Sequence, residues 1–200
     1  MLPFRGEGTR SASQRRTMTT LPHDDRLALE GAQERIEEMI SSGTPLRETL
    51  EELMRIVEAM TPSGMIGSIL ILDEQGRHLL HGAGPSLPDA YNAAIDGIEI
   101  GPEVGSCGTA AFHDKTVSVF DIANNPLWAN FKDLALQYGL RACWSTPIHG
   151  SDGKVLGTFA NYYKFVRDPS PVDRELTEMI TRTAAMAIEK DRHARLAAPA

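Results

Sequence analysis

The chain has 200 residues, 42% of them hydrophobic, which is enough for one domain with a substantial core and short for two domains. Its 20 basic and 27 acidic residues give a net charge of -7, which argues against a nucleic-acid partner because such a partner selects a basic surface. No apolar run approaches the roughly 18 residues of a membrane-spanning helix, and no hydrophobic signal segment follows the first residues. We therefore expect a cytoplasmic protein whose two cysteines are free thiols.

Composition divides the chain into three parts. Residues 1–22 are rich in Arg, Ser and Thr and lack an apolar period, so we predict a disordered basic tail. Residues 23–195 form one predicted domain that includes an amphipathic helix at each end, and residues 196–200 form a short tail.

Apolar residues recur at helical spacing over residues 24–40 and predict a first amphipathic helix. Thr44 is the predicted N-cap of a second helix, with Pro45 in its first turn. Residues 65–72 follow as a strand rich in Ile and Leu, and residues 73–76 turn the chain into a return strand. The buried face of the second helix is predicted to consist of Leu46, Leu50, Leu53, Val57 and Met60.

Residues 82–100 contain breakers at Gly84-Pro85 and Leu87-Pro88 and a short helix at residues 89–95. We expect this segment to be a mobile cover over a pocket.

Residues 101–148 hold both cysteines and both tryptophans, and we interpret them as the walls of a ligand pocket. Ser106 stands between Gly105 and Gly108 and is predicted to cap a helix, which would leave backbone N–H groups free to face a small anion or a carbonyl. Alternating β-branched residues predict a strand at residues 116–121.

A short helix is predicted next, and Gly139 ends it. Residues 141–148 then return as a strand, which brings Cys143 back towards the pocket. The apolar face of the short helix is predicted to contain Leu127 or Trp128, Phe131, Leu134 and Tyr138.

The last third of the domain is a hairpin followed by a helix. Residues 151–153 are a predicted turn, and residues 154–163 are a long alternating strand. Ser170 is the predicted N-cap of the last helix, and Asp173, three residues later, completes a capping box with Asp in place of Glu. This helix is predicted to run to about residue 194.

Four segments carry a resemblance to a known family: GSCGTA at residues 105–110, DIANNPLW at 121–128, GLRACWSTPI at 139–148 and GKVLGTF at 153–159. Together they resemble the GAF domain family over roughly residues 26–190. The resemblance implies an α+β, PAS-related fold with a central antiparallel β-sheet of five to six strands and helices on both faces. It also implies a sensory domain that binds a small molecule and passes its occupancy through the terminal helices.

Members of this family bind cyclic nucleotides, haem, bilins, nitrate or iron centres, and the four segments select none of these, so the cofactor is unknown. The histidines lack metal-ligand spacing, because His78 and His81 are three apart on a predicted strand and so point to opposite faces. No residue is marked as the axial ligand or reactive thiol that a haem or bilin would need. We therefore predict no metal site and no tetrapyrrole.

The candidate ligand-binding residues come from three segments of the pocket. Trp128 and Trp144 are interpreted as walls for a planar or small apolar ligand or, alternatively, as lids on the core. Arg141 is a candidate partner for a carboxylate or phosphate or, alternatively, a surface residue at a helix end. The predicted ligand-binding residues are Ser106, Cys107, Gly108, Thr109, Trp128, Arg141, Cys143 and Ser145.

Cys107 is the best candidate for reactivity because the dipole at a helix N-terminus stabilises a thiolate. The alternative is a small residue that packs under a tight turn. One branch of the family reduces free methionine sulfoxide, and its motif resembles the Cys-Gly-Thr-Ala here. That branch works with further cysteines that this chain lacks, and Cys143 is expected at the wrong place to act as the second thiol, so we predict no enzyme.

Two rival functions remain beside ligand sensing: a thiol redox sensor that uses Cys107, and a structural dimerisation module with an empty pocket. The amphipathic terminal helices favour a homodimer. No kinase, cyclase, phosphodiesterase or DNA-binding motif occurs in the chain. We therefore expect the signalling partner, such as a histidine kinase or a cyclic-dinucleotide enzyme, in another protein or in another part of a longer one.

Overall fold

The computed structural model describes residues 23–61 and 63–197, so the predicted tail at 1–22 lies outside the described residues. Helices and strands are interspersed along the chain, with two short 3-10 turns, η1 and η2, in the middle. In chain order the elements are α1 (His23–Ser42), α2 (Leu46–Met60), β1 (Ile66–Leu72), β2 (His78–Ala83), α3 (Asp89–Ile95), β3 (Ile98–Glu99), α4 (Gly105–His113), β4 (Val117–Val119), η1 (Ile122–Asn124), η2 (Pro126–Trp128), α5 (Lys132–Gln137), β5 (Ala142–His149), β6 (Val155–Tyr163) and α6 (Pro171–Ala197).

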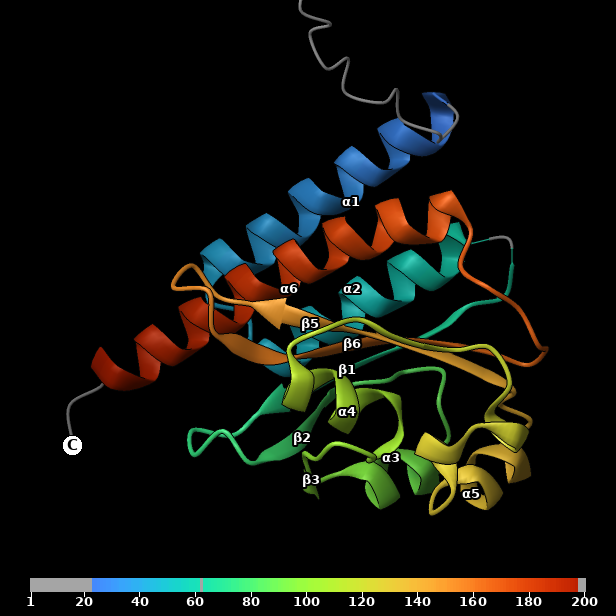
Figure 1. Ribbon diagram of the computed structural model, residues 1–200. Coiled ribbons are helices and arrows are strands. Elements are labelled where there is room, and N and C mark those ends of the chain that lie inside the picture. The colour runs from blue at the N-terminus through green and yellow to red at the C-terminus, as the bar shows by residue number, and fades with distance from the viewer. Residues whose placement is uncertain (1–22, 62, 198–200) are drawn as a thin grey trace, which may run out of the picture.

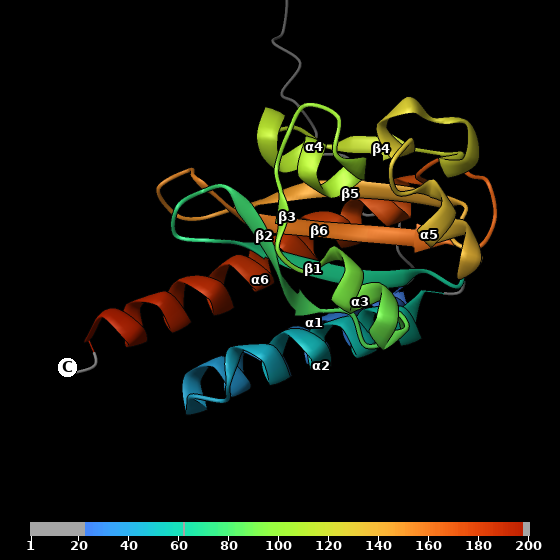
Figure 2. The same cartoon turned by 90° about the horizontal axis from the view of Figure 1, so that it is seen from below.

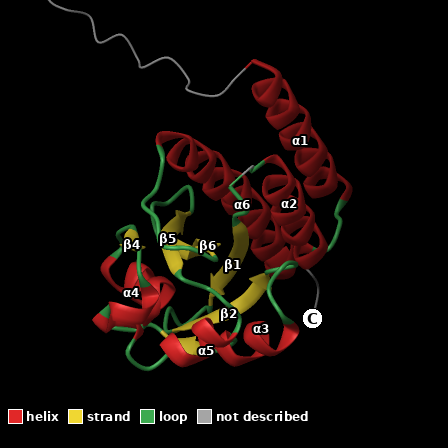
Figure 3. Ribbon diagram, turned by 90° about the vertical axis from the view of Figure 1, so that its right-hand side faces the viewer, coloured by secondary structure: helices red, strands yellow, loops and turns green. Residues whose placement is uncertain are grey.

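The six strands form one antiparallel sheet in the order β3-β2-β1-β6-β5-β4. Helices α1, α2 and α6 lie over one face, and α3, α4 and α5 lie over the other (Figures 1 and 3). The α+β architecture with helices on both faces is therefore confirmed. No helix in the described part of the chain is both long enough and apolar enough to cross a membrane.

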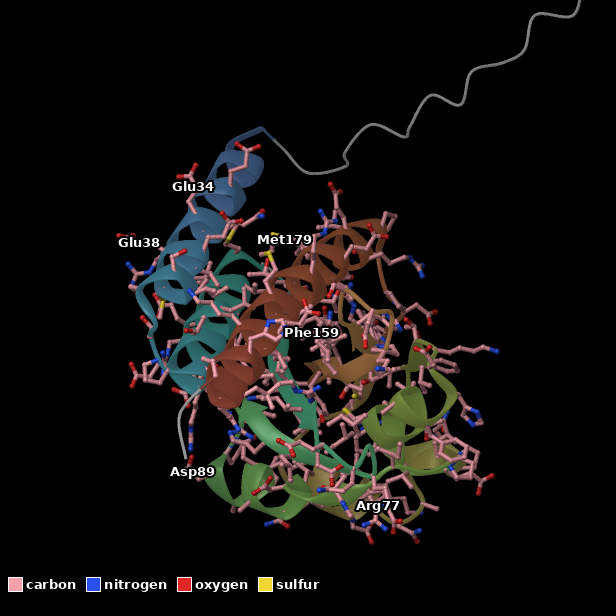
Figure 4. All side chains as sticks on the ribbon, turned by 90° about the vertical axis from the view of Figure 1, so that its left-hand side faces the viewer. Glu34, Glu38, Arg77, Asp89, Phe159 and Met179 are labelled. Atoms are coloured by element: carbon pink, nitrogen blue, oxygen red, sulfur yellow. The ribbon has the colours of Figure 1, made fainter. Side chains whose placement is uncertain are left out.

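Side chains of the central strands alternate between two separate cores, because successive residues of a strand point to opposite faces. On β5, Trp144 belongs to the core under α2 and α6, whereas Cys143 belongs to the core under α3, α4 and α5. On β6, Phe159 and Tyr162 divide in the same way. In Figure 4, Phe159 lies beneath α6, while Glu34 and Glu38 point outward from α1.

Two predicted helix starts are wrong. Pro45, and not Thr44, is the N-cap of α2, and the Thr44 hydroxyl instead forms a hydrogen bond with the Ser42 hydroxyl at 3.2 Å. Ser106 lies inside α4, whose N-cap is Val104, so its hydroxyl is free to bond elsewhere. The predicted short helix is split into η2 and α5, because Phe131 has a non-helical φ of −125°.

The start of α6 matches the predicted capping box. The Ser170 N–H donates to Asp173 Oδ2 at 2.7 Å, and the Asp173 N–H donates to Ser170 Oγ at 3.2 Å. The same buried carboxylate accepts hydrogen bonds from the Tyr163 hydroxyl at 2.9 Å and from Arg167 Nη2 at 2.5 Å. Asp173 thus joins the start of α6 to the end of β6.

Replacing Asp173 with alanine should lower the free energy of unfolding by about 3 kcal/mol, because it leaves the half-buried Arg167 and the buried Tyr163 without their partner. Urea unfolding followed by circular dichroism measures the change. Asp168→Ala is the matched control, since Asp168 is exposed in the same loop, and should cost less than about 0.5 kcal/mol. Equal losses in the two variants would show that the Asp173 contacts contribute little.

Candidate functional site

A cavity of about 30 Å³ lies between the sheet and helices α3, α4 and α5. A single water needs about 10–15 Å³ of such space, so the cavity has room for only two or three small groups. None of the side chains that line it is charged. The lining consists of Leu70, Tyr91, Ile95, Ile98, Val104, Gly105, Ser106, Cys107, Gly108, Trp128, Phe131, Leu134 and Tyr162.

The Ser106 hydroxyl joins three segments at the edge of this cavity. It donates to the backbone oxygen of Cys143 at 3.2 Å and accepts from Trp128 Nε1 at 3.1 Å. All three residues are buried, where an unpaired polar group would cost about 1–3 kcal/mol. Ser106 therefore fixes the first turn of α4 against β5 and holds the indole of Trp128 as a wall.

Three aromatic rings form the deep end of the cavity. The rings of Tyr91 and Tyr162 meet edge to face with centroids 5.9 Å apart, and Trp128 meets Tyr162 in the same way at 6.5 Å. Burial raises the pKa of both tyrosine hydroxyls above the usual value, although a hydrogen bond between the two hydroxyls opposes this for Tyr91. Both therefore remain neutral donors.

The two cysteines are free and buried, and their side chains interact. The interaction with Cys143 lowers the pKa of Cys107, against the opposing effect of burial, and nearby hydroxyls of Ser145, Thr158 and Tyr162 lower this pKa further. Burial and the interaction with Cys107 raise the pKa of Cys143. Cys107 is therefore the thiol of the pair that ionises first, as its place in the first turn of α4 also favours.

Four of the eight predicted site residues line the cavity: Ser106, Cys107, Gly108 and Trp128. The other four, Thr109, Arg141, Cys143 and Ser145, do not.

Each of these four residues lies outside the cavity lining and makes other contacts. The Thr109 hydroxyl accepts from the Val104 N–H at 3.0 Å and so serves the start of α4. The Arg141 side chain is 43% exposed and lies 3.5 Å from Asp121. Cys143 and Ser145 are fully buried on β5, next to Cys107. Trp144, interpreted above as a pocket wall, faces the opposite core.

Sequence reasoning missed nine residues of the lining. Two of them, Tyr91 and Ile95, lie four apart on α3, an apolar pair on one helix face that the pattern of residues 89–95 already contained. The predicted cover thus supplies one wall of the cavity, and its mobility stays a prediction. The missed residues are Leu70, Tyr91, Ile95, Ile98, Val104, Gly105, Phe131, Leu134 and Tyr162.

Comparison with known proteins agrees with this architecture. The GAF domain family matches residues 43–189, so the chain belongs to the GAF domain family. A methyl sulfide methyltransferase-associated sensor from Methanosarcina acetivorans is 37% identical over 158 residues, which are 79% of this chain and 16% of the relative. The chain therefore spans about a sixth of that relative's length.

Two solved structures show the same fold. The GAF domain of an Acinetobacter phosphoenolpyruvate-protein phosphotransferase superposes with a TM-score of 0.64 at 16% identity, over 85% of this chain and 98% of that one. A free methionine-R-sulfoxide reductase from Neisseria meningitidis, in complex with its substrate, superposes with a TM-score of 0.62 at 17% identity, over 90% and 99%. The fold thus occurs in a domain of a phosphotransferase and in a free methionine-R-sulfoxide reductase.

The thiol pair predicts a pH-dependent reactivity. Alkylation of Cys107 by iodoacetamide should reach half its maximal rate below about pH 8.5, where an ordinary cysteine ionises, because the thiolate forms at lower pH. Cys143 should react far more slowly in the folded protein. Mass spectrometry of peptides after timed alkylation at several pH values measures both rates.

Cys143→Ala is the matched variant, because it removes the thiol that donates to Cys107 and leaves the helix start in place. In this variant the half-maximal pH of Cys107 alkylation should rise. An unchanged profile, or faster labelling of Cys143 in the parent protein, would contradict the assignment of Cys107 as the more acidic thiol.

Proposed function

We propose that this GAF domain is a sensor of a small, neutral molecule that binds in the cavity beside Cys107. The observation that carries the proposal is the cavity itself, which is lined mainly by aromatic and aliphatic side chains, has a volume of about 30 Å³ and has no charged side chain in its lining. An apolar pocket with a few placed polar groups is the usual form of a small-molecule site. The cavity as it stands is too small for a cyclic nucleotide or a tetrapyrrole.

Polar groups at the cavity determine which hydrogen-bonding atom the ligand can carry. The first turn of α4 has no side-chain cap, so its backbone N–H groups can donate to an acceptor oxygen. The Cys107 thiol, 8% exposed, lies in the same turn. The ligand is therefore a compact apolar group with at most one acceptor atom, and the methyl sulfide in the name of the Methanosarcina acetivorans relative is of this class.

The occupied cavity would change the position of α6 through the strands that separate them. Cys143 contacts Cys107 on the cavity side of β5, and the next residue, Trp144, packs in the core under α6. Helix α6 continues past the sheet and ends near the chain terminus, where Leu196 is 83% exposed (Figure 2). A signalling partner or a second copy of the chain would receive the change on this exposed end. In the proposed cytoplasmic relay, this partner is a histidine kinase or a cyclic-dinucleotide enzyme.

Dimethyl sulfide and dimethyl sulfoxide are the first probes, tested by thermal unfolding of the full chain. At a concentration 100 times its dissociation constant, a ligand that binds only the folded state raises the free energy of unfolding by about 2.7 kcal/mol. This corresponds to a rise of several degrees in Tm. Acetate, a charged molecule of similar size, should give no rise because the lining holds no cation.

Leu134→Trp should abolish the rise, because residue 134 lines the cavity and the larger ring would occupy it. The matched control is Leu127→Trp, since Leu127 is also partly buried against the same core but does not line the cavity. A rise that survives in Leu134→Trp would place the probe elsewhere. No rise with any small neutral probe would leave the structural dimerisation module as the better description.

A second candidate function rests on the contact between the two thiols. Cys143 is expected from the sequence at the wrong place for a second thiol, but its interaction with the Cys107 thiol supports it in that role. A peroxide could transfer one oxygen to the Cys107 thiolate, giving a sulfenic acid and the alcohol. The Cys143 thiol would then displace water from that sulfenic acid and form a disulfide.

Intact mass spectrometry after exposure to hydrogen peroxide tests this candidate. A disulfide removes two hydrogens, so the mass should fall by about 2 Da, whereas Cys143→Ala should stop at a sulfenic acid that dimedone traps. Turnover of free methionine sulfoxide with dithiothreitol as reductant, lost in Cys107→Ser, would make the domain an enzyme. A mass that stays unchanged and an absence of turnover would leave the ligand sensor.

A further inference from the structure

A second and larger cavity, of about 280 Å³, lies on the other face of the sheet. It is bounded by β4 and β5 on one side and by the first turns of α6 on the other. Its volume is just below the range of about 300–1,000 Å³ that small-molecule pockets usually have. The lining consists of Thr116, Ser118, Trp144, Thr146, Pro169, Asp173, Arg174, Thr177 and Glu178.

The strand wall of this cavity is polar, in contrast to the rest of the same face. Ser118 pairs with Trp144 across β4 and β5, so the two side chains share this face. Thr116 and Thr146 add a pair of hydroxyls 3.2 Å apart. Hydroxyls on a sheet face beside a cavity supply both donors and acceptors to a polar occupant.

Trp144 provides the observation that points to a ligand. Its side chain is 4% exposed, yet its Nε1 donor is buried and has no hydrogen-bond partner. The same atom of the other tryptophan, Trp128, donates a hydrogen bond to Ser106 Oγ. A buried N–H without an acceptor costs about 1–3 kcal/mol, and a small rotation of the indole towards the cavity that it lines would let an acceptor atom there recover this cost.

The wall formed by α6 carries a cation, Arg174, and an anion, Glu178, one helical turn apart. Arg174 donates one hydrogen bond to the backbone oxygen of Pro169 at 3.0 Å and keeps its remaining donors. Glu178 lies four residues further along the same helix, and no ion pair within 4.0 Å joins it to Arg174 in the described part of the chain. Asp173, the other acid of the lining, is already neutralised by Arg167.

We infer that this cavity binds a small zwitterion, such as a free α-amino acid. Its carboxylate accepts from Trp144 Nε1 and Arg174, and its ammonium group faces Glu178 and the hydroxyls of β4 and β5. An isolated anion or an isolated cation would leave one of the two helix charges without a partner. The site is independent of the cavity beside Cys107, since β5 separates the two.

Nuclear magnetic resonance of the full chain tests this assignment directly. The chain has two tryptophans, so a ¹⁵N-labelled sample gives two indole N–H signals, and Trp144→Phe identifies one of them. Titration with a mixture of the natural L-amino acids, followed by each alone, should shift the Trp144 signal in a saturable way and leave the Trp128 signal in place. Propionate should shift it more weakly, and methylammonium should not.

Two variants test the contacts of the carboxylate and of the ammonium group separately. Arg174→Gln should weaken amino-acid binding at least tenfold, whereas Arg182→Gln, an exposed arginine of the same helix outside the cavity, should not. Glu178→Gln should weaken amino-acid binding and leave propionate binding unchanged. The inference is overturned if no amino acid shifts the Trp144 signal, if inorganic phosphate shifts it as strongly, or if Arg174→Gln and Arg182→Gln behave alike.

Discussion

The alternation of side chains along β5 is the constraint on which both sites depend. Strands β5 and β6 are buried on both faces along nearly their whole length, because helices cover the sheet on each side. Each residue of β5 therefore points to one face: Cys143 and Ser145 to the face that carries the small apolar cavity, Trp144 and Thr146 to the face that carries the larger polar one. A register slip of one residue would exchange the two sets and destroy both sites.

Much of the fold could be predicted from the sequence because its signals are local. Ser170 and Asp173 stand three residues apart, and their reciprocal hydrogen bonds depend only on that spacing and on a helix that follows. The short helix at residues 89–95 and the turn before β2 were likewise set by neighbouring residues. The four quoted segments then gave the family, and with it the order of the layers.

The site resisted prediction where its contacts cross the fold. Ser106 resembled a helix cap, but its hydroxyl bonds with Trp128, 22 residues away, and with Cys143, 37 residues away. No local pattern encodes partners at such distances, because they depend on how β5 returns beneath α4. The same return explains why Cys143 meets Cys107, and why Arg141, next to Gly139 and Leu140 in the sequence, ends beside Asp121 instead.

The small volume beside Cys107 sets the working range of any signal received there. The very best small ligands gain about 1.5 kcal/mol per non-hydrogen atom, so a molecule of about four such atoms gains at most about 6 kcal/mol. That free energy corresponds to a dissociation constant of tens of micromolar at the tightest. A receptor with the proposed site would release its ligand quickly, and its output would follow an abundant metabolite or dissolved gas as the concentration rises and falls.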